Sequence, residues 1–347
     1  MKIGFFTVGL DTPAARYRVR QFVPHFERHG IRCEHHYAYG EAYNRLLGTP
    51  WATPYKLATR VRRAVTTLYA RPYDLIFLQR TALPGTAWPE RIAAAQGRPL
   101  IFDFDDAIYL DERGAESVYR RKAFQDAIDC SALAIAGTEY LRAQGRRPEK
   151  TTVIPTVIDT EAYQPKTGAE KNDAVVIGWM GTASNFPSLR TVWPAVRRVL
   201  ERRPKSVFRI VSNGRLPELE RQPQVQMVQW TAARELADLQ GFDLGVMPLE
   251  DNEITRGKCG FKLILYMAVG IPVLASPVGA NIEIVSPEVG VVPSTDEQWS
   301  KELERLVDDA ALRRRLGEAA RARAVAKYSV QSVLPLYLSQ FSRLAGA

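Results

Sequence analysis

Residues 257–275 read GKCGFKLILYMAVGIPVLA, which predicts a loop, a helix, a tight turn and a buried strand in direct succession. Gly270 is expected to end the helix, and residues 273–275 have the continuous apolar character of a strand covered on both faces. A helix N-terminus offers backbone N–H groups and the positive end of a dipole. Glycines let the backbone approach a ligand closely, and Lys258 and Lys262 add mobile positive charge. The segment therefore predicts a binding site for a phosphorylated ligand.

Strand-like and helix-like patterns alternate along the rest of the chain. Apolar runs, each followed by a helical pattern, occur at residues 3–8, 74–79, 100–104, 132–136, 174–181, 207–211 and 244–249. Such alternation predicts an α/β protein with doubly wound parallel sheets. Residues 160–173 contain Pro, Lys and Gly with little apolar periodicity, and they form the best candidate for a linker. We therefore expect two domains, at residues 1–165 and 174–328.

The composition narrows the cellular setting and the class of partner. The 347 residues carry a net charge of +9, which suits nucleic acid, an anionic membrane face or an anionic small substrate. The three cysteines are scattered and odd in number, which argues against a disulfide framework or a zinc site. The sequence has no apolar run long enough to span a membrane, and residues 1–9 are interrupted too soon for a signal peptide. We expect a cytoplasmic protein.

Acidic residues end the apolar run that begins at Leu100, and an open α/β sheet places its functional groups at such strand ends. Asp103 and Asp105 form an Asp-x-Asp pattern, which metal-dependent sugar-nucleotide enzymes use to hold a divalent ion. The pattern is a weak signal, because alternation in a strand points both side chains the same way with or without a metal. We therefore favour Asp105 and Asp106 as ligands of an acceptor hydroxyl, and we expect no metal.

Basic residues gather early in the helix predicted from residue 13 to residue 29, after a turn-rich loop that begins at Gly9. Arg16, Arg18 and Arg20 lie in its first turns, where positive charge opposes the helix dipole unless an anion or nearby carboxylates compensate. The cluster indicates contact with a phosphate or an acidic acceptor, or else a solvated basic face.

A second basic segment, residues 54–71, is predicted to form an amphipathic helix. Its apolar residues share one face at helical spacing and its basic residues lie elsewhere; the apolar set is Leu57, Val61, Ala64, Val65 and Leu68. A helix of this kind can lie on an anionic membrane surface. The alternative is an ordinary domain helix with a basic outer face.

Three glycine-containing loops follow strands and precede helices in the second half. The glycines are Gly181, Gly257 and Gly260, and the cations expected at the same sheet edge are Arg256, Lys258 and Lys262. Lys258 and Lys262 are four residues apart, so they could share a helix face. The alternative is a basic surface loop. The sequence has no Walker A motif, no Gly-x-Gly-x-x-Gly and no Gly-x-Ser-x-Gly, which argues against an NTPase, a dinucleotide oxidoreductase and a serine hydrolase.

These motifs together resemble the retaining GT-B glycosyltransferases of family 4, which use nucleotide-sugar donors. The resemblance is carried by residues 178–181 (GWMG), 245–249 (GVMPL), 257–263 (GKCGFKL), 266–268 (YMA), 270–273 (GIPV) and 278–285 (VGANIEIV). Residues 15–20 and 154–159 are also similar to one branch of the family. The resemblance spans nearly the whole chain, and its motifs in the second half are the more specific ones.

The resemblance implies two Rossmann-like domains facing a cleft, with a C-terminal helix at 329–347 that packs back on the first domain. It implies metal-independent, cofactor-independent hexosyl transfer with retention, in cell-surface glycan, polysaccharide or glycoconjugate synthesis, with possible attachment to the cytoplasmic membrane face. The implied catalytic residues are Asp105, Asp106, Lys258 and Lys262. The implied donor-binding residues are Gly181, Thr182, Asn185, Arg256, Gly257, Gly260, Leu265 and Asn281. The implied acceptor-side residues are Gly9, Arg16 and Arg18.

The sequence departs from the family pattern in the donor region. The family's Glu-x7-Glu motif would place glutamates at Gly257 and Leu265, and Thr182 follows Gly181 where the family has Gly-Arg-Leu. Asp105 stands where the family has a histidine. Leu265 therefore also allows a catalytically silent protein that binds sugar nucleotides or serves as a scaffold. Nucleic-acid binding is disfavoured, because no patch interleaves aromatic and basic residues.

Overall fold

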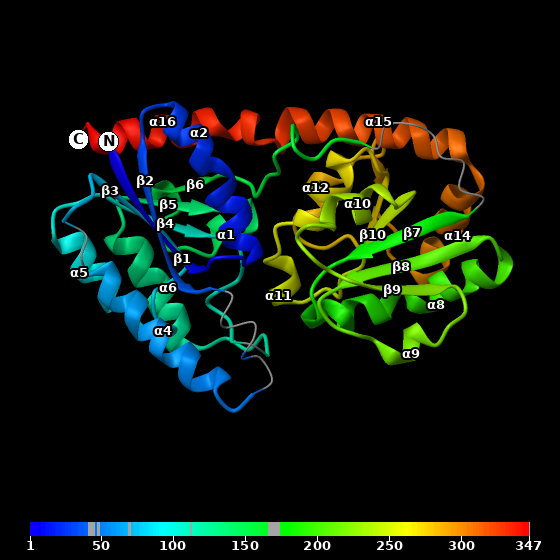
Figure 1. Cartoon of the computed structure of the whole chain (residues 1–347), viewed down its shortest axis with the longest axis horizontal. Helices are drawn as coiled ribbons and strands as arrows, with labels where there is room; N and C mark the ends of the chain where they lie inside the picture. Colours follow the sequence, from blue (N-terminus) through cyan, green and yellow to red (C-terminus); the bar gives the residue numbers. More distant parts are fainter. Residues whose placement is uncertain (41–45, 47–48, 69–70, 112, 166–173, 347) are drawn as a thin grey trace. The chain divides into compact units, whose positions relative to one another are not determined.

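The structure is a computed structural model that describes residues 1–40, 46, 49–68, 71–111, 113–165 and 174–346. The chain folds into two units, each built on a six-stranded parallel sheet (Figure 1). The first unit comprises Met1–Val157, Gly257–Cys259 and Val333–Ala347, and the second comprises Ile158–Arg256 and Gly260–Ser332. Two parallel sheets flanked by helices confirm the predicted α/β class.

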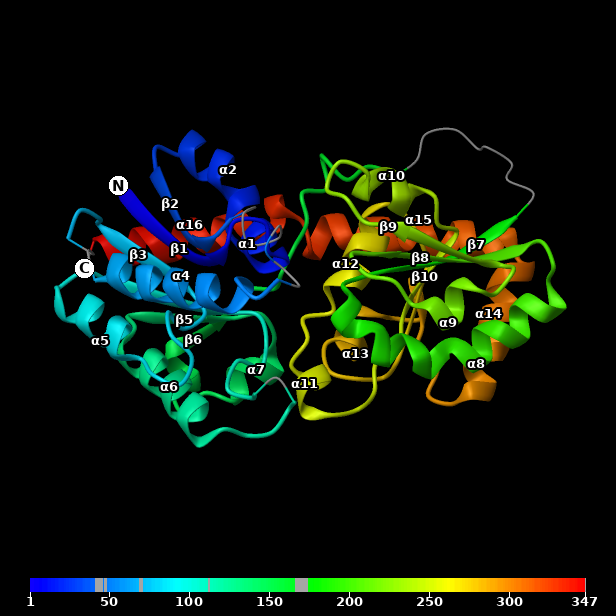
Figure 2. The same ribbon diagram turned by 60° about the horizontal axis from the view of Figure 1, so that its bottom comes forward.

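The sheet of the first unit has the strand order β2-β1-β3-β4-β5-β6, and its pairs are parallel. Its strands are β1 (Lys2–Gly9), β2 (Arg32–Tyr39), β3 (Leu75–Gln79), β4 (Leu100–Phe104), β5 (Leu133–Ala136) and β6 (Thr151–Val153). Its helices are α1 (Pro13–Arg18), η1 (Arg20–Phe22), α2 (Val23–Arg28), α4 (Ala52–Thr67), α5 (Trp88–Ala95), α6 (Val118–Cys130), α7 (Glu139–Ala143), η2 (Pro148–Lys150) and α16 (Val330–Ala345). Figures 1 and 2 show α4, α5 and α6 on one face of this sheet, and α1, α2 and α16 on the other.

Two cores hold these layers on the first sheet. On the α2 and α16 face, aromatic rings pack within 5 to 7 Å of one another; the set is Phe5, Phe22, Phe26, Phe77, Tyr337 and Phe341. On the opposite face, Phe6 packs with Ile76, Leu78 and Ala93. Phe5 and Phe6 take opposite faces because successive side chains of a strand alternate. Burial of aromatic rings is the main stabilising contribution on the first of these faces.

The predicted helix from residue 13 to residue 29 is wrong in its continuity. The structure has α1, a single 3-10 turn and α2, with the break at Val19, whose φ is −128°. Pro24 lies in the first turn of α2. A proline has no N–H to donate and its ring crowds the carbonyl four residues earlier, which favours an interruption of the helix before this position.

The sheet of the second unit has the strand order β12-β11-β10-β7-β8-β9. Its strands are β7 (Val175–Met180), β8 (Ser206–Ser212), β9 (Val225–Gln229), β10 (Leu244–Met247), β11 (Val273–Ala275) and β12 (Gly290–Val291). Its helices are η3 (Ala183–Asn185), α8 (Phe186–Arg202), α9 (Pro217–Glu220), α10 (Glu235–Gln240), α11 (Glu253–Arg256), α12 (Phe261–Ala268), α13 (Asn281–Ile284), α14 (Asp296–Asp308) and α15 (Ala310–Lys327). α8 and α14 pack their buried apolar side chains against the strands and form the hydrophobic core of this unit.

The segment 257–275 forms the loop, helix, turn and strand that its sequence predicts. Gly260 precedes α12 with a φ of +64°, and Gly270 follows it with a φ of +75°. These left-handed conformations favour glycine at both ends of the helix. The hydroxyl of Tyr266 accepts a hydrogen bond from the backbone N–H of Met180 at 2.9 Å. α12 is thereby fixed to the carboxyl end of β7.

The predicted linker at 160–173 is described only as far as residue 165. Thr160 and Tyr163 lie in the second unit, where their carbonyls accept hydrogen bonds from the guanidinium of Arg321, each at 2.7 Å. Residues 166–173 lie outside the described residues. The start of this segment is therefore part of the second unit.

Candidate active site

The second unit brings a lysine and a glycine together at the carboxyl end of β7. A Cβ atom on Gly181 would lie 2.6 Å from Cε of Lys262 and 2.9 Å from the ring of Trp179. Nζ of Lys262 lies 5.6 Å from the centroid of that ring, a cation–π contact. The ammonium group is therefore held over the Gly181 turn, next to the first turn of α12. We call Gly181, Gly260 and Lys262 the candidate phosphate site.

The N-terminus of α12 has the features that favour an anion. Gly260 is its N-cap and has no side chain to cap the helix. Helix N–H groups and the dipole favour negative charge at this end. A Cβ atom on Gly260 would lie 2.3 Å from Cδ1 of Ile284 and 3.6 Å from Oδ1 of Asn281, so the backbone here is closely packed. Asn281 is buried, and its amide donates to the carbonyl of Ser276 at 3.1 Å. Asn281 therefore shapes the loop behind the N-terminus of α12.

The turn after Gly181 is organised by its own polar side chains. The amide of Asn185 donates to the hydroxyl of Thr182 at 2.8 Å, and that hydroxyl lies 2.9 Å from the hydroxyl of Ser184. The side chain of Asn213, in the loop after β8, accepts from the N–H of Ala183 at 3.0 Å. Thr182 and Asn185 are thus brought together at the carboxyl edge of the sheet, as predicted from the position of the turn.

Arg256 and Leu265, both predicted to bind the donor, make contacts with other parts of the protein. Arg256 makes a two-point ion pair with Asp251, at 2.6 and 3.0 Å, so its charge is already matched by a carboxylate. Leu265 lies on α12 and is 5% exposed. An apolar side chain without hydrogen-bonding atoms packs into the core of the unit, which gives Leu265 a packing role.

The loop Gly257–Cys259 packs within the first unit. A Cβ atom on Gly257 would lie 2.7 Å from Cβ of Ala107, and the thiol of Cys259 donates to the carbonyl of Asp105 at 2.9 Å. Burial, and then the negative charge of Asp105, raise the pKa of the Cys259 thiol far above its usual range. Lys258 lies in this loop, whereas Lys262 lies on α12. Of the two alternatives for these lysines, a shared helix face or a shared approach to the helix N-terminus, the first does not occur, because the helix begins only at Phe261.

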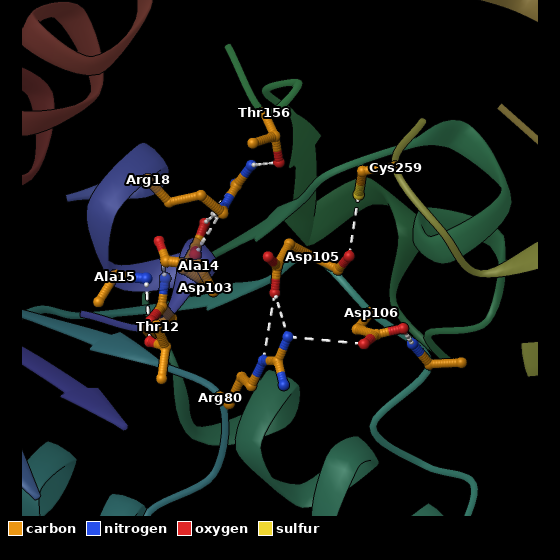
Figure 3. A network of polar contacts seen from close by, with 12 residues as sticks. Thr12, Ala14, Ala15, Arg18, Arg80, Asp103, Asp105, Asp106, Thr156 and Cys259 are labelled. Atoms are coloured by element: carbon orange, nitrogen blue, oxygen red, sulfur yellow. Dashed lines mark hydrogen bonds and ion pairs between the residues drawn. The ribbon is translucent and has the colours of Figure 1, made fainter. Parts of the chain in front are cut away.

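In the first unit an arginine binds the predicted catalytic carboxylate (Figure 3). The guanidinium of Arg80 donates to Oδ1 of Asp105 from Nε at 3.2 Å and from Nη2 at 2.9 Å. Nη2 also lies 3.6 Å from Oδ2 of Asp106. The side chain of Asp105 is 12% exposed and that of Asp106 is 37% exposed. Asp105 and Asp106 are thus brought together around one cation at the carboxyl end of β4.

Arg80 sets the ionisation of Asp105. Burial alone would raise the pKa of this carboxyl, but the charges of Arg80 and then Arg18 outweigh burial and hold the pKa below its usual range. Asp105 is therefore ionised at neutral pH. An ionised carboxylate accepts hydrogen bonds, so Asp105 is suited to orienting a hydroxyl group and unsuited to donating a proton.

The sequence interpretation missed Arg80, although its position carried a signal. It directly follows β3, which is the neighbour of β4 in the sheet, so both strand ends meet at one edge. Arg80 has a φ of +60°, a strained conformation for a residue other than glycine. The turn is held by Arg63, which donates to the carbonyls of Gln79, Arg80 and Thr81, and by Glu90, which accepts from the N–H of Ala82 at 2.6 Å. Strain of this kind is typical of functional sites.

Arg18 and Asp103 form a second, fully buried pair (Figure 3). Nε of Arg18 donates to both oxygens of Asp103, at 3.0 and 2.8 Å, and Nη2 also donates to Oδ1. Nη1 donates to the carbonyl of Ile154 and to the hydroxyl of Thr156, each at 3.1 Å. Both charged side chains have no exposed surface. Arg18, predicted to lie on the acceptor side, is therefore enclosed by protein groups, and the Asp-x-Asp pattern does not present two open carboxylates.

The other two acceptor-side residues lie near the end of β1. Gly9 is the last residue of β1, and a Cβ atom there would lie 2.9 Å from Cγ2 of Thr12 and 3.0 Å from the ring of Tyr39. Thr12 is the N-cap of α1 and accepts from the N–H of Ala15 at 3.4 Å. Arg16 is half-buried, with its guanidinium 4.8 Å from the ring centroid of Tyr17. Gly9 therefore lets the loop and α1 pack closely at this strand end.

Within the part of the chain that the structure describes, no group of three or more His, Cys, Asp or Glu side chains is arranged to hold a metal ion. No helix formed by the described residues is both long and apolar enough to cross a membrane.

Comparison with solved structures defines the class of the fold. The chain is similar to a sucrose-phosphate synthase from Thermosynechococcus elongatus, with a TM-score of 0.75 and 17% identity over 99% of this chain and 98% of that one. It is similar to HepE of Anabaena, solved with UDP and glucose, with a TM-score of 0.67 and 17% identity over 99% of both chains. It is also similar to the catalytic domain of starch synthase IV from Arabidopsis thaliana, with a TM-score of 0.70 and 12% identity over 100% of both. The fold is GT-B.

Comparison of sequences identifies the second half more closely. Residues 173–309 match the family model described as glycosyl transferases group 1. The chain is also 30% identical over 204 residues to the MMP alpha-(1->4)-mannosyltransferase of Mycolicibacterium hassiacum, covering 54% of this chain and 46% of that protein. The match thus spans about half the length of that curated relative. The chain thus has the GT-B fold, and its residues 173–309 match the group 1 glycosyltransferase model, in the half where the sequence motifs resemble that family.

Proposed function

We propose that this protein is a glycosyltransferase that moves a sugar from a nucleotide-sugar donor to the hydroxyl group of an acceptor. The observation that carries this proposal is the candidate phosphate site, where the ammonium of Lys262 lies over Gly181 beside the N-terminus of α12. Positive charge and helix N–H groups at one place suit a diphosphate. The solved complexes of HepE with UDP and glucose, in a protein of the same fold, support a nucleoside diphosphate as the ligand class.

The two halves of the reaction are assigned to different units. In the second unit, Lys262 and the α12 dipole stabilise the negative charge that grows on the diphosphate as its bond to the sugar breaks. In the first unit, Asp105 is held ionised by Arg80 and orients the acceptor hydroxyl that forms the new bond. Lys258 and Asp106 are the second candidates for these two tasks.

We further propose hexosyl transfer with retention and without metal or cofactor, in the synthesis of cell-surface glycans or polysaccharides at the cytoplasmic face of the membrane. The family resemblance supports retention and the glycan setting. The guanidinium partners of Asp103 and Asp105 support a metal-free reaction, because each carboxylate already binds a cationic side chain. The basic helix α4 supports a location at an anionic membrane surface.

Ligand binding tests the proposed function directly. A nucleoside diphosphate or nucleotide-sugar that binds the folded protein is expected to raise its melting temperature by about 5 °C at roughly one hundred times its dissociation constant. The measurement is a thermal-shift screen of these compounds, with nucleoside monophosphates as controls. Release of nucleoside diphosphate is then measured in excess chelator, where an unchanged rate is expected. No shift with any compound would contradict the proposal.

The alternative is a silent protein that binds sugar nucleotides, and Leu265 is the observation that favours it. A buried leucine cannot hydrogen-bond the ribose hydroxyls that the family's glutamate binds. Slow hydrolysis of the donor, lost on Lys262→Ala, would exclude this alternative. Thermal shifts without any hydrolysis or transfer would support it.

We predict that Arg80→Met moves the acid limb of the pH–rate profile to higher pH. Because Arg80 lowers the pKa of Asp105, the stability that this carboxylate contributes is present above its unfolded pKa and is lost as the pH falls through the lowered value. Without Arg80 this loss begins at a higher pH. The rate and the melting temperature are both measured between about pH 4 and pH 8. Arg80→Lys, which keeps the charge, is the matched control, and an unshifted profile in Arg80→Met would refute the pairing.

A further inference from the structure

Helix α4 is turned with its apolar side toward solvent. Leu57, Val61 and Val65 follow one another at helical spacing and are 63%, 52% and 43% exposed. The opposite side of the helix carries Thr59, which is 7% exposed, and Arg63, which is 5% exposed. Of the predicted apolar set, Leu57, Val61 and Val65 are exposed, whereas Ala64 is buried. Part of the predicted apolar face is therefore turned outward, next to the exposed Arg62.

The inward face of α4 is fixed by specific hydrogen bonds. The guanidinium of Arg63 donates to the carbonyl of Thr81 at 3.1 Å and to that of Arg80 at 3.2 Å, and it also donates to the carbonyl of Gln79. Rolling the helix to bury its valines would remove these bonds and leave buried carbonyls without a partner, which is costly. The exposure of the apolar face is therefore built into the fold.

Neighbouring helices extend the exposed apolar face. α4, α5 and α6 lie on the same face of the first sheet (Figure 2). Exposed apolar side chains on and next to these helices are Trp51, Trp88, Ile92, Val118 and Tyr119, with exposures from 42% to 78%. We call Leu57, Val61 and Val65, together with these five residues, the apolar face of the first unit. Exposed apolar side chains on helices that cover the same face of a sheet are typical of an interaction surface.

The charge around α4 identifies the partner. The sequence between residues 42 and 73 contains no aspartate or glutamate. Lys56 and Arg60 are half-buried on one side of the apolar stripe. Arg62 is exposed on the other side, and its guanidinium donates to the carbonyls of Tyr37 and Ala38 at 2.8 and 2.9 Å. Long basic side chains can lay their stems along apolar surface and extend their charge to lipid headgroups. Tryptophan, with an apolar body and a polar N–H, suits the boundary between acyl chains and water.

We propose that the apolar face of the first unit docks on an anionic lipid bilayer, with α4 lying in the headgroup region. Along α4, exposed apolar side chains whose charged neighbours in the sequence are all cations match a surface that is apolar below and negatively charged above. A second copy of this chain fits less well, because the same cations would face one another across a symmetric contact. The inference specifies the membrane attachment named in the proposed function, and vesicle binding tests it without requiring catalysis.

Vesicle binding of the full chain tests this proposal. The protein is expected to bind phosphatidylcholine vesicles that contain phosphatidylglycerol, and to bind pure phosphatidylcholine vesicles at least about tenfold more weakly. Sodium chloride at about 0.5 M is expected to release it, because salt screens the attraction. Leu57→Asp/Val61→Asp is expected to lower the partition coefficient at least about tenfold, and Lys56→Glu/Arg60→Glu to lower it on anionic vesicles.

Leu336→Asp is the matched control. Leu336 is 46% exposed on α16, on the other face of the same sheet, and its replacement is expected to leave vesicle binding within about twofold. Melting curves with and without nucleoside diphosphate show that each variant is folded and separate this test from the proposed function. Wild-type binding by Leu57→Asp/Val61→Asp would overturn the proposal. A dimer in solution that this double variant dissociates would also overturn it, in favour of a second copy.

Discussion

Lys262→Ala is expected to lower the turnover rate by about a hundredfold to a thousandfold, the usual effect of removing one group that stabilises transition-state charge. The ammonium of Lys262 is held over Gly181 and the ring of Trp179, beside the N-terminus of α12. A departing diphosphate at this site gains negative charge as the sugar leaves, so the interaction strengthens in the transition state. The measurement is the release of nucleoside diphosphate at saturating donor, combined with a melting curve of the variant.

The controls for Lys262 separate charge from packing. Lys262→Arg keeps the positive charge and is expected to retain more activity than Lys262→Ala, whereas Lys301→Ala, at an exposed position on α14, is expected to behave as wild type. Lys258→Ala is expected to reduce the rate as well, and its effect is measured separately because Lys258 lies in the loop before α12. Wild-type rates in both Lys262→Ala and Lys258→Ala would refute the proposed role of this segment in binding phosphate.

The fold was accessible from the sequence because its signals are local. Apolar runs of four to eight residues followed by helical patterns indicate parallel strands joined by helices, and a pattern of this kind needs no knowledge of distant contacts. The two ends of α12 could also be predicted locally. Gly260 and Gly270 lie at its ends because the left-handed conformation at each position favours glycine. A further local signal that the interpretation neglected was Pro24, which lies in the first turn of α2, after the break at Val19 in the helix predicted from residue 13.

The candidate site depended on contacts between distant parts of the sequence, which no local pattern records. Arg80 reaches Asp105 across 25 positions, and Arg18 reaches Asp103 across 85. The sequence therefore identified the carboxylates at the end of β4 and Arg18, but neither Arg80 nor the pairing of Arg18 with Asp103. Helical spacing in the sequence identified the stripe of apolar residues on α4. It could not show which way the helix is turned, because that depends on the hydrogen bonds from Arg63 to carbonyls at the end of β3.

Arg18→Met is expected to lower the free energy of unfolding of the first unit by about 3–5 kcal/mol, because it leaves the carboxylate of Asp103 buried without its partner. Burial alone would lower the pKa of the Arg18 guanidinium, but the charge of Asp103 outweighs burial and holds it above its ordinary value. The guanidinium therefore stays charged, whereas burial outweighs the charge of Arg18 at Asp103 and raises the pKa of that carboxyl. The measurement is chemical denaturation followed by the fluorescence of the first unit's aromatic residues.

The pH dependence of the Arg18 variant distinguishes a lost ion pair from lost packing. Burial already raises the pKa of Asp103 in the wild type, and removing the charge of Arg18, which lowers that pKa, raises it further. The variant therefore loses more stability than the wild type as the pH rises. The deficit relative to wild type is expected to be smaller near pH 5 than near pH 8. Arg18→Met/Asp103→Leu removes both charges and is expected to recover part of the loss, since buried pairs replaced by apolar residues are often tolerated.

Arg20→Met breaks an exposed pair with Asp11 in the adjoining turn and should cost less than about 1 kcal/mol. Equal losses in the Arg18 and Arg20 variants would show that the buried pair does not anchor this edge of the sheet.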